Sequence, residues 1–186
     1  MMEGKGQVHA YDIDGRRLSA LIPRLKRSGA HNVQLVHPKE PDALDALKGQ
    51  MDVVFVDAPC TGTGTWRRRP DAKWRLTEAA LAKRSAEQDA VLDAASAFVK
   101  PGGTLVYVTC SVLGAENGGR VDAFLHRSSN RFSPVDMTAR WADTLPDVQS
   151  AYRAVPIAGE PAGGLMLSPR MSGTDGFFIA ALKAAS

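Results

Sequence analysis

The sequence has no long apolar run and only two cysteines among its 186 residues. A membrane-spanning helix requires roughly 18 apolar residues, and none of the runs approaches that length. The first six residues also lack the apolar segment of a secretory signal peptide. We therefore expect a cytoplasmic protein with no membrane partner. Two cysteines are too few for a disulfide framework or for a zinc site built on thiols, so we expect reduced thiols and no metal.

Two common catalytic motifs are also missing. The glycine-bearing segment Thr61–Thr65 does not end in Gly-Lys-Ser/Thr, so a phosphate-binding P-loop is not indicated. None of the four histidines forms a recognisable pair with a cysteine, which disfavours a hydrolase of the papain type.

Basic residues concentrate in one short segment. The whole chain has a net charge of +3, whereas residues 65–84 alone carry +5. A local basic segment indicates a polyanionic substrate, although a solvated basic face without a partner is an open alternative. Arginines can hold phosphates and aromatic rings can stack on unpaired bases, so Trp66 and Trp74 could contact RNA bases. The alternative is that they pack the loop onto the core, and we expect this for Trp74. The candidate RNA-binding residues are Arg67, Arg68, Arg69, Lys73 and Arg75.

Hydrophobic periodicity predicts alternating strands and helices. The strands are expected at residues 7–13, 32–36, 52–57, 104–109 and 176–182, and the helices at 16–29 with a kink at Pro23, 42–47, 77–99 and 120–128. Gln88 is a polar exception in the apolar stripe of the third helix, and residues 130–175 show little regular pattern. The run Val53–Val56 suits a parallel strand covered on both faces. The alternation predicts an α/β fold, a three-layer sandwich with a mainly parallel sheet in one domain, 1–186.

Each cysteine follows a predicted buried strand. Cys60 comes three residues after Asp57, and Cys110 comes directly after Thr109. If these strands are parallel neighbours, both thiols emerge at the edge where open α/β sheets bind ligands. A nucleophilic cysteine needs exposure and a lowered pKa, or a substrate that is activated as it attacks, and the strand end provides the exposure. The alternative for Cys60 is a small buried apolar residue.

An acid also ends the first predicted strand. In nucleotide-binding sheets, a carboxylate at such a position accepts hydrogen bonds from ribose hydroxyls, which makes Asp12 a candidate cofactor ligand. The alternative is an acid that caps the following helix, a role for which Asp14 is better placed.

Several motifs together resemble the RNA cytosine-C5 methyltransferases of the Sun/Fmu type, which include the RsmB-like enzymes. The paired Pro-Cys and Thr-Cys motifs are specific, and the likeness extends over most of residues 6–182. The matching segments are Asp57–Gly64, Arg69–Asp71, Lys100–Ser111, Glu116-Asn117 and Asp175–Phe178.

The resemblance implies a Rossmann-like enzyme that uses S-adenosylmethionine to methylate C5 of cytosine in RNA, in ribosomal RNA rather than transfer RNA. Cys110 matches the nucleophile that adds to C6, and Cys60 matches the cysteine that assists release. Asp57 matches an acid beside the methyl donor and the target base, where it could stabilise a protonated N3. Asp12 matches the acid that holds the cofactor ribose. Covalent addition is chemically reasonable, because it divides one difficult step into easier ones.

The chain departs from this family at two places. The family has a strand, a glycine-rich cofactor loop and a helix before the segment that corresponds to Gln7, and it often has an acid after the third strand, where this chain has His37-Pro38. The missing strand belongs between the strands at 7–13 and 52–57, so we expect a partial domain with open strand edges and weak cofactor binding by the isolated chain.

Two other functions stay open at this point. The chain could be a catalytically impaired remnant that only binds RNA through residues 65–84, or a thiol redox enzyme that uses Cys60 and Cys110. The sequence determines neither the target nucleotide nor the oligomeric state.

Overall fold

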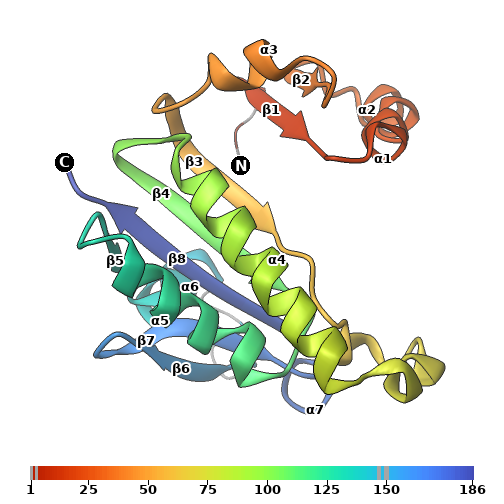
Figure 1. Ribbon diagram of the computed structural model, residues 1–186, viewed down its shortest axis with the longest axis vertical. Helices are drawn as coiled ribbons and strands as arrows, with labels where there is room; N and C mark the ends of the chain where they lie inside the picture. Colours follow the sequence, from red (N-terminus) through yellow and green to blue (C-terminus); the bar gives the residue numbers. More distant parts are fainter. Residues whose placement is uncertain (1, 3, 146–147, 149–150) are drawn as a thin grey trace. The chain divides into compact units, whose positions relative to one another are not determined.

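A computed structural model describes residues 2, 4–145, 148 and 151–186. The chain divides into two compact units, Met1–Lys48 and Gly49–Ser186, which we describe separately (Figure 1). The interpretation of residues 1–186 as one partial domain stays a prediction.

The first unit is a small parallel sheet with three short helices. Strand β1 (Val8–Tyr11) pairs in parallel with β2 (Val33–Val36). The helix expected over 16–29 is divided into α1 (Gly15–Ser19) and α2 (Ile22–Ser28). Pro23 lies in the first turn of α2, where a missing N–H breaks no helical hydrogen bond, so the proline begins a helix and does not kink one. Helix α3 (Pro41–Asp45) lies in the segment where a helical turn was predicted.

The second unit contains a six-stranded mixed sheet. Its strand order is β3-β4-β8-β7-β6, and β5 also pairs with β8. Strands β3 and β4 are parallel, whereas the pairs β4–β8, β8–β7, β7–β6 and β5–β8 are antiparallel. The prediction of a mainly parallel sheet is therefore wrong for this unit. The strands are β3 (Met51–Asp57), β4 (Val99–Thr109), β5 (Phe132–Pro134), β6 (Arg153–Ile157), β7 (Glu160–Leu167) and β8 (Phe177–Ala184).

Helices α4 and α5 contact each other and the strands of this sheet (Figure 1). Their core is formed by fully buried side chains such as Leu92, Tyr107 and Phe124. Burying a large apolar side chain contributes about 1.5–3 kcal/mol to the free energy of folding. The buried layer therefore fixes α4 and α5 against the sheet. The helices of the unit are α4 (Glu78–Ser96), α5 (Gly118–Arg127), α6 (Met137–Thr144) and α7 (Pro169–Ser172), with 3-10 turns η1 (Thr63–Thr65), η2 (Pro70–Arg75) and η3 (Gly114–Glu116).

Strand β3 is covered on one face only. Val56 is buried, whereas Val53 is 59% exposed and Phe55 is 65% exposed. The prediction that both faces of this strand are covered is therefore wrong. Among the described strands, β1 pairs only with β2 and β3 only with β4, so the open edges expected for these strands are present.

Residues 130–175 contain more regular structure than their composition predicts. Strands β6 and β7 form a hairpin whose turn residues, Ala158 and Gly159, both have positive φ (47° and 85°). Glycines inside β7 permit close packing, because a Cβ at Gly164 would lie 2.6 Å from Cε2 of Phe178. Glycine normally disfavours strands, so the sequence pattern concealed a hairpin that tertiary packing stabilises.

The N-terminus of α4 tests the local basis of the fold. Oγ1 of Thr77 accepts a hydrogen bond from the Ala80 amide at 3.1 Å, as the predicted N-cap requires. We expect Thr77→Ala to lower the free energy of unfolding by about 1 kcal/mol, measured by urea denaturation. Thr77→Ser keeps the capping oxygen and is the matched control. Equal stabilities for the two variants would contradict this role.

Candidate active site

The two cysteines meet at one edge of the sheet. Because β3 and β4 are parallel neighbours, the loops that follow them begin side by side, with Asp57 in register with Val108. The sulfur atoms of Cys60 and Cys110 are 3.3 Å apart, within hydrogen-bonding distance. Both thiols are free and half-buried.

A pocket of about 420 Å³ surrounds the sulfur pair. The three predicted catalytic residues, Asp57, Cys60 and Cys110, all line it. Arg68 and Arg69 of the basic segment line it as well, whereas Arg67, Lys73 and Arg75 do not. Phe177, at the start of β8, lines the pocket too, although its sequence motif indicated no role for it. The remaining lining residues are Thr61, Gly62, Thr65 and Ala72.

The two thiols are electrostatically unequal. A hydrogen bond from Cys60 lowers the pKa of Cys110 to about 7, against the opposing effects of burial and of the nearby Asp57 and Glu116 carboxylates. The same hydrogen bond, together with burial, raises the pKa of Cys60. Cys110 is therefore the thiolate of the pair near neutral pH, and Cys60 retains its proton. Because the thiolate is the nucleophilic form of cysteine, the lower pKa favours Cys110 over Cys60 for a nucleophilic role.

The basic segment is held to β8 by a buried carboxylate. Asp175, which is 8% exposed, pairs with Arg68 at 2.5 Å and with Arg67 at 3.8 Å. The hydrogen bond from Arg68 lowers the pKa of Asp175. Arg67 and Arg68, two of the five candidate RNA-binding residues, therefore form ion pairs within the protein. Their side chains remain more than half exposed.

The other three candidate cations lie farther along the loop. Arg75 forms an ion pair with Asp71. For Arg69 and Lys73, the described part of the chain contains no ion pair. Trp74 is 79% exposed, and the Lys73 ammonium lies 4.6 Å from its ring centroid. The expectation that Trp74 packs onto the core is therefore wrong, because this loop projects the indole into solvent.

Two glycines tie the cysteine loop to the start of β8. The Gly64 amide donates to the Cys110 carbonyl at 2.9 Å, and the Gly64 carbonyl accepts from Gly176 at 2.8 Å. A Cβ at Gly64 would lie 2.2 Å from the Gly176 oxygen, so only glycine allows this approach.

A buried polar network behind the pocket was not predicted. Glu116, Asn117 and Gln88 have 0–1% exposure and are hydrogen-bonded to the residues that flank the cysteines. The polar exception at Gln88 in an apolar helical stripe was the available signal. Its partners lie 28 and 29 residues away, so the sequence did not reveal them.

Asp12 lies in the first unit, at the carboxyl end of β1. Its Oδ1 accepts a hydrogen bond from the Asp14 amide at 2.8 Å. Asp14 caps α1 by accepting from the Arg16 amide at 2.9 Å, as predicted. The capping role therefore belongs to Asp14, and the Asp12 carboxylate lies in the turn before it.

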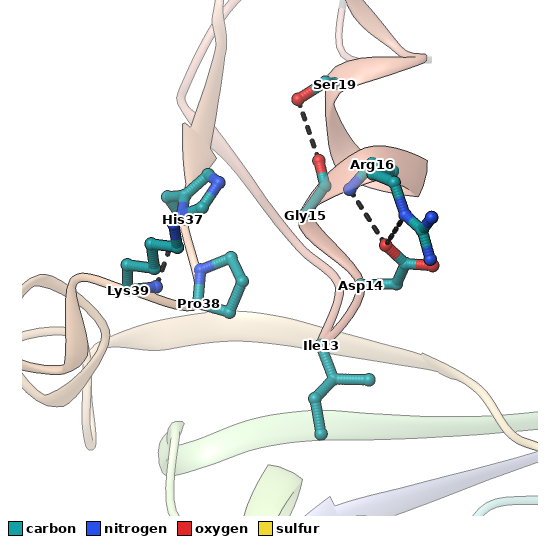
Figure 2. A pocket seen from close by; sticks show the side chains of 8 residues that line it. All are labelled: Ile13, Asp14, Gly15, Arg16, Ser19, His37, Pro38 and Lys39. Carbon is teal, nitrogen blue, oxygen red and sulfur yellow. Dashed lines mark hydrogen bonds and ion pairs between the residues drawn. The ribbon is translucent and has the colours of Figure 1, made fainter.

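A cavity of about 660 Å³ adjoins this turn (Figure 2). The segment Ile13–Arg16 with Ser19 lines one side of it, and His37, Pro38 and Lys39, which follow β2, line the other. Because β1 and β2 are parallel, both segments leave the same edge of the small sheet. A Cβ at Gly15 would lie 2.7 Å from Nε2 of His37, so a side chain at that position would narrow the cavity.

The described residues contain no group of three or more His, Cys, Asp or Glu side chains arranged to hold a metal ion. Within the same residues, no helix has both the length and the apolar character needed to cross a membrane.

Comparison with known proteins decides the family. The model of the 16S rRNA methyltransferase RsmB/F family matches residues 1–183. The chain belongs to this family. The RsmB/F family consists of S-adenosylmethionine-dependent RNA cytosine-C5 methyltransferases, so the resemblance in the sequence motifs is confirmed.

Relatives and solved structures agree with this assignment. The chain is 42% identical over 127 residues to the ribosomal RNA small subunit methyltransferase B of Enterobacter sp. (strain 638), covering 68% of this chain and 29% of that protein. It is 34% identical over 191 residues to the probable ribosomal RNA small subunit methyltransferase B of Synechocystis sp. (strain ATCC 27184 / PCC 6803 / Kazusa), covering 100% and 39%. The chain thus spans about a third of the length of these curated relatives.

The crystal structure of NSun6 from Pyrococcus horikoshii with SFG superposes with a TM-score of 0.72 at 28% identity, covering 100% of this chain and 43% of that one. A methyltransferase homolog protein from Pyrococcus horikoshii gives a TM-score of 0.74 at 26% identity, covering 98% and 55%. The α/β fold of S-adenosylmethionine-dependent methyltransferases is therefore confirmed, with a mixed sheet.

The unequal thiols predict a pH profile. Site-specific alkylation of Cys110 by iodoacetamide, followed by peptide mass spectrometry, should reach half of its maximal rate near pH 7, because the reactive thiolate forms above the pKa. Cys60→Ala removes the stabilising hydrogen bond, so the midpoint should rise by about 1–2 pH units. Cys60→Ser keeps a donor and should stay near the original midpoint. An unchanged or lower midpoint in Cys60→Ala would contradict the assignment.

Proposed function

We propose that this chain is the catalytic part of an enzyme that methylates C5 of cytosine in ribosomal RNA through a covalent adduct between Cys110 and C6 of the base. The observation that carries the proposal is the contact between the two sulfur atoms, 3.3 Å apart in a pocket that also contains Asp57 and two arginines. Membership of the RsmB/F family supports the same chemistry.

Cytosine C5 is a poor nucleophile until a group adds at C6. The Cys110 thiolate forms a bond to C6, and the π electron pair of the C5–C6 double bond shifts to C5 and, through the C4–N3 bond, onto N3. N3 takes a proton from water, and C5 becomes electron-rich. Asp57, at the end of β3 and on the wall of the pocket, stabilises the protonated N3 of the activated ring. S-adenosylmethionine supplies the methyl group when it is bound.

Cys60 acts when the adduct is resolved. After C5 loses its proton to water, the electron pair of that C–H bond re-forms the C5–C6 double bond. The bond between C6 and Cys110 breaks, and the sulfur leaves as a thiolate. The hydrogen bond from Cys60 that lowers the pKa of Cys110 also stabilises this leaving group. Cys60 therefore assists release, while Cys110 is the nucleophile.

Asp12 is proposed to hold the cofactor ribose. Its carboxylate lies in the turn after β1, directly before residues that line the cavity of the first unit, and one oxygen is oriented by the Asp14 amide. A carboxylate at the end of a parallel strand is the acceptor that vicinal ribose hydroxyls require. The position of Asp12 therefore supports a role as the ribose ligand, whereas His37-Pro38 stands at this edge where the family often has an acid.

The RNA-binding role is proposed for the basic segment beside the pocket. A target base must leave its stack to reach Cys110, so the substrate is a single-stranded or locally opened RNA. Arg68 and Arg69 line the pocket and can contact the phosphates beside the extruded base. Trp74, exposed beside Lys73, offers a stacking surface for a neighbouring base.

Trapping the adduct tests the catalytic proposal. With target RNA and S-adenosylmethionine, Cys60→Ala should accumulate a covalent protein–RNA species that survives denaturing electrophoresis, because addition proceeds and release fails. Cys110→Ala should form none. RNA binding with neither adduct nor methyl transfer would favour an RNA-binding protein without catalysis. A Cys60–Cys110 disulfide that cycles with thioredoxin would favour a thiol redox enzyme.

The basic segment can be tested independently of chemistry. The double variant Arg69→Ala, Lys73→Ala should weaken binding of single-stranded RNA, and the slope of log K against log[salt] should fall by about 0.7 for each phosphate contact that is lost. Lys48→Ala, outside residues 65–84, is the matched control and should leave both quantities unchanged. Equal affinities for the two variants in a salt titration would remove the RNA-binding role from this segment.

A further inference from the structure

One buried carboxylate joins the two cysteine loops. Glu116, at the end of η3, has no exposed surface. Its Oε1 accepts from the Thr61 amide at 2.8 Å and from Nε2 of Gln88 at 3.1 Å. Its Oε2 accepts from the hydroxyls of Thr61 and Ser111, both at 2.5 Å. Four donors therefore converge on a group that has only acceptor sites when it is ionised.

The partners of Glu116 are the immediate neighbours of the two cysteines. Thr61 follows Cys60 in the chain, and Ser111 follows Cys110. Both hydroxyls meet on the same oxygen atom, so the carboxylate fixes the two loops relative to each other directly after each sulfur-bearing residue.

Each cysteine is also held on its other side. Nε2 of Gln88 donates to the Pro59 carbonyl at 2.8 Å, directly before Cys60. Asn117 accepts from the Thr109 hydroxyl at 2.6 Å and donates to the Ser111 carbonyl at 2.9 Å, on the two sides of Cys110. Glu116 reaches both loops through one side chain next to each cysteine. The Thr63 hydroxyl adds a second link farther along the loops, since it hydrogen-bonds to the Ser111 hydroxyl and accepts from the Val112 amide, both at 3.0 Å.

We propose that Glu116 is the positioning residue that sets the placement of the Cys60 and Cys110 sulfur atoms relative to each other. Its meaning for methyl transfer rests on the function proposed above, whereas the sulfur placement can be measured by itself. Stabilising the thiolate is not the role of Glu116, because the negative charge of Glu116 raises the pKa of Cys110. The role that the structure supports for Glu116 is the placement of the two loops that its hydrogen bonds join.

The rest of the loop pairing does not depend on Glu116. The Ala58 amide donates to the Val108 carbonyl, and the Gly64 amide donates to the Cys110 carbonyl, both at 2.9 Å. These backbone bonds continue the β3–β4 ladder past the strand ends. We therefore expect a Glu116 variant to keep the loops adjacent while the two sulfur atoms lose their fixed placement relative to each other. We call this placement the register of the thiols.

The effective concentration of one thiol at the other measures this register. In a glutathione redox buffer, the two protein thiols are oxidised to a disulfide while one glutathione disulfide is reduced to two glutathione thiols. The equilibrium constant of that exchange is the effective concentration, and it falls when the sulfur atoms lose their mutual placement. The measurement uses the 186-residue chain without RNA or cofactor, so failure of the proposed methyl transfer leaves it interpretable.

Glu116→Ala should lower the effective concentration about tenfold or more, since contacting residues in one hydrogen-bonded network are strongly coupled. Glu116→Gln keeps the length of the side chain and one carbonyl acceptor, and the Thr61 and Ser111 hydroxyls can accept from its amide, so it should remain within about threefold of the unaltered chain. An effective concentration for Glu116→Ala equal to that of the unaltered chain would overturn the proposal.

Ser96→Ala is the control for a purely structural effect. It removes another buried hydroxyl in the same unit, the donor to the Asp93 carbonyl, and it should leave the effective concentration unchanged. If Glu116→Ala does not fold, Thr61→Val decides the question, because it removes the hydroxyl that donates to Oε2 of Glu116. Thr61→Val should lower the effective concentration severalfold, whereas Thr61→Ser keeps the hydroxyl and should not. No effect in Thr61→Val would overturn the proposal.

Catalysis adds a second outcome. If the adduct chemistry holds, Glu116→Ala should accumulate the covalent RNA species as Cys60→Ala does, because Cys60 no longer reaches the departing sulfur. Rescue of turnover by Glu116→Gln would support positioning. Loss of RNA binding in Glu116→Ala, with the effective concentration unchanged, would count against it.

Discussion

The parallel pairing of β3 with β4 is the constraint on which the rest of the site depends. It places the carboxyl ends of two buried strands side by side, so two loops that are fifty residues apart in the chain begin at neighbouring positions. Helix α4 passes over the same edge and contributes Gln88, and η3 contributes Glu116. The antiparallel strand β8 pairs with β4 and brings Phe177 to the pocket, and Asp175, two residues before β8, pairs with Arg68 of the pocket wall. A slip of one residue in the β3–β4 register would reverse which side chains enter the core and would separate the sulfur atoms.

Two buried carboxylates near the pocket, Asp175 and Glu116, have different partners. Asp175 pairs with Arg67 and Arg68, so it orients two guanidinium groups of the basic segment. Glu116 has no cationic partner among the described residues and is satisfied by hydroxyl, amide and side-chain amide donors. A buried carboxylate requires such donors, because desolvation strongly disfavours an isolated charge. Asp175 thus pairs with exposed arginines, whereas Glu116 hydrogen-bonds to both cysteine loops.

Much of the first-order architecture was predictable. The five predicted strands all correspond to observed strands, and Thr77 and Asp14 cap helices as expected, because local periodicity and capping chemistry act over a few residues. The hairpin β6–β7 was missed, since Gly163 and Gly164 disfavour strands locally and are required there by contact with distant residues. The exposure of Trp74 and of Phe55 was missed for a related reason, because a sequence pattern indicates apolar character without showing what covers it.

The sequence by itself determined the family and the candidate site residues. The paired cysteine motifs identified the family, the two candidate catalytic thiols and Asp57, because residue type and strand-end position are local properties that motif spacing preserves. The tertiary structure decided which thiol has the lower pKa, which arginines pair with Asp175, and which buried side chains hydrogen-bond to the cysteine loops. Those properties depend on distances of a few ångströms between residues far apart in the chain, and hydrogen-bond strength and pKa respond to such distances while the order of residues along the chain does not specify them.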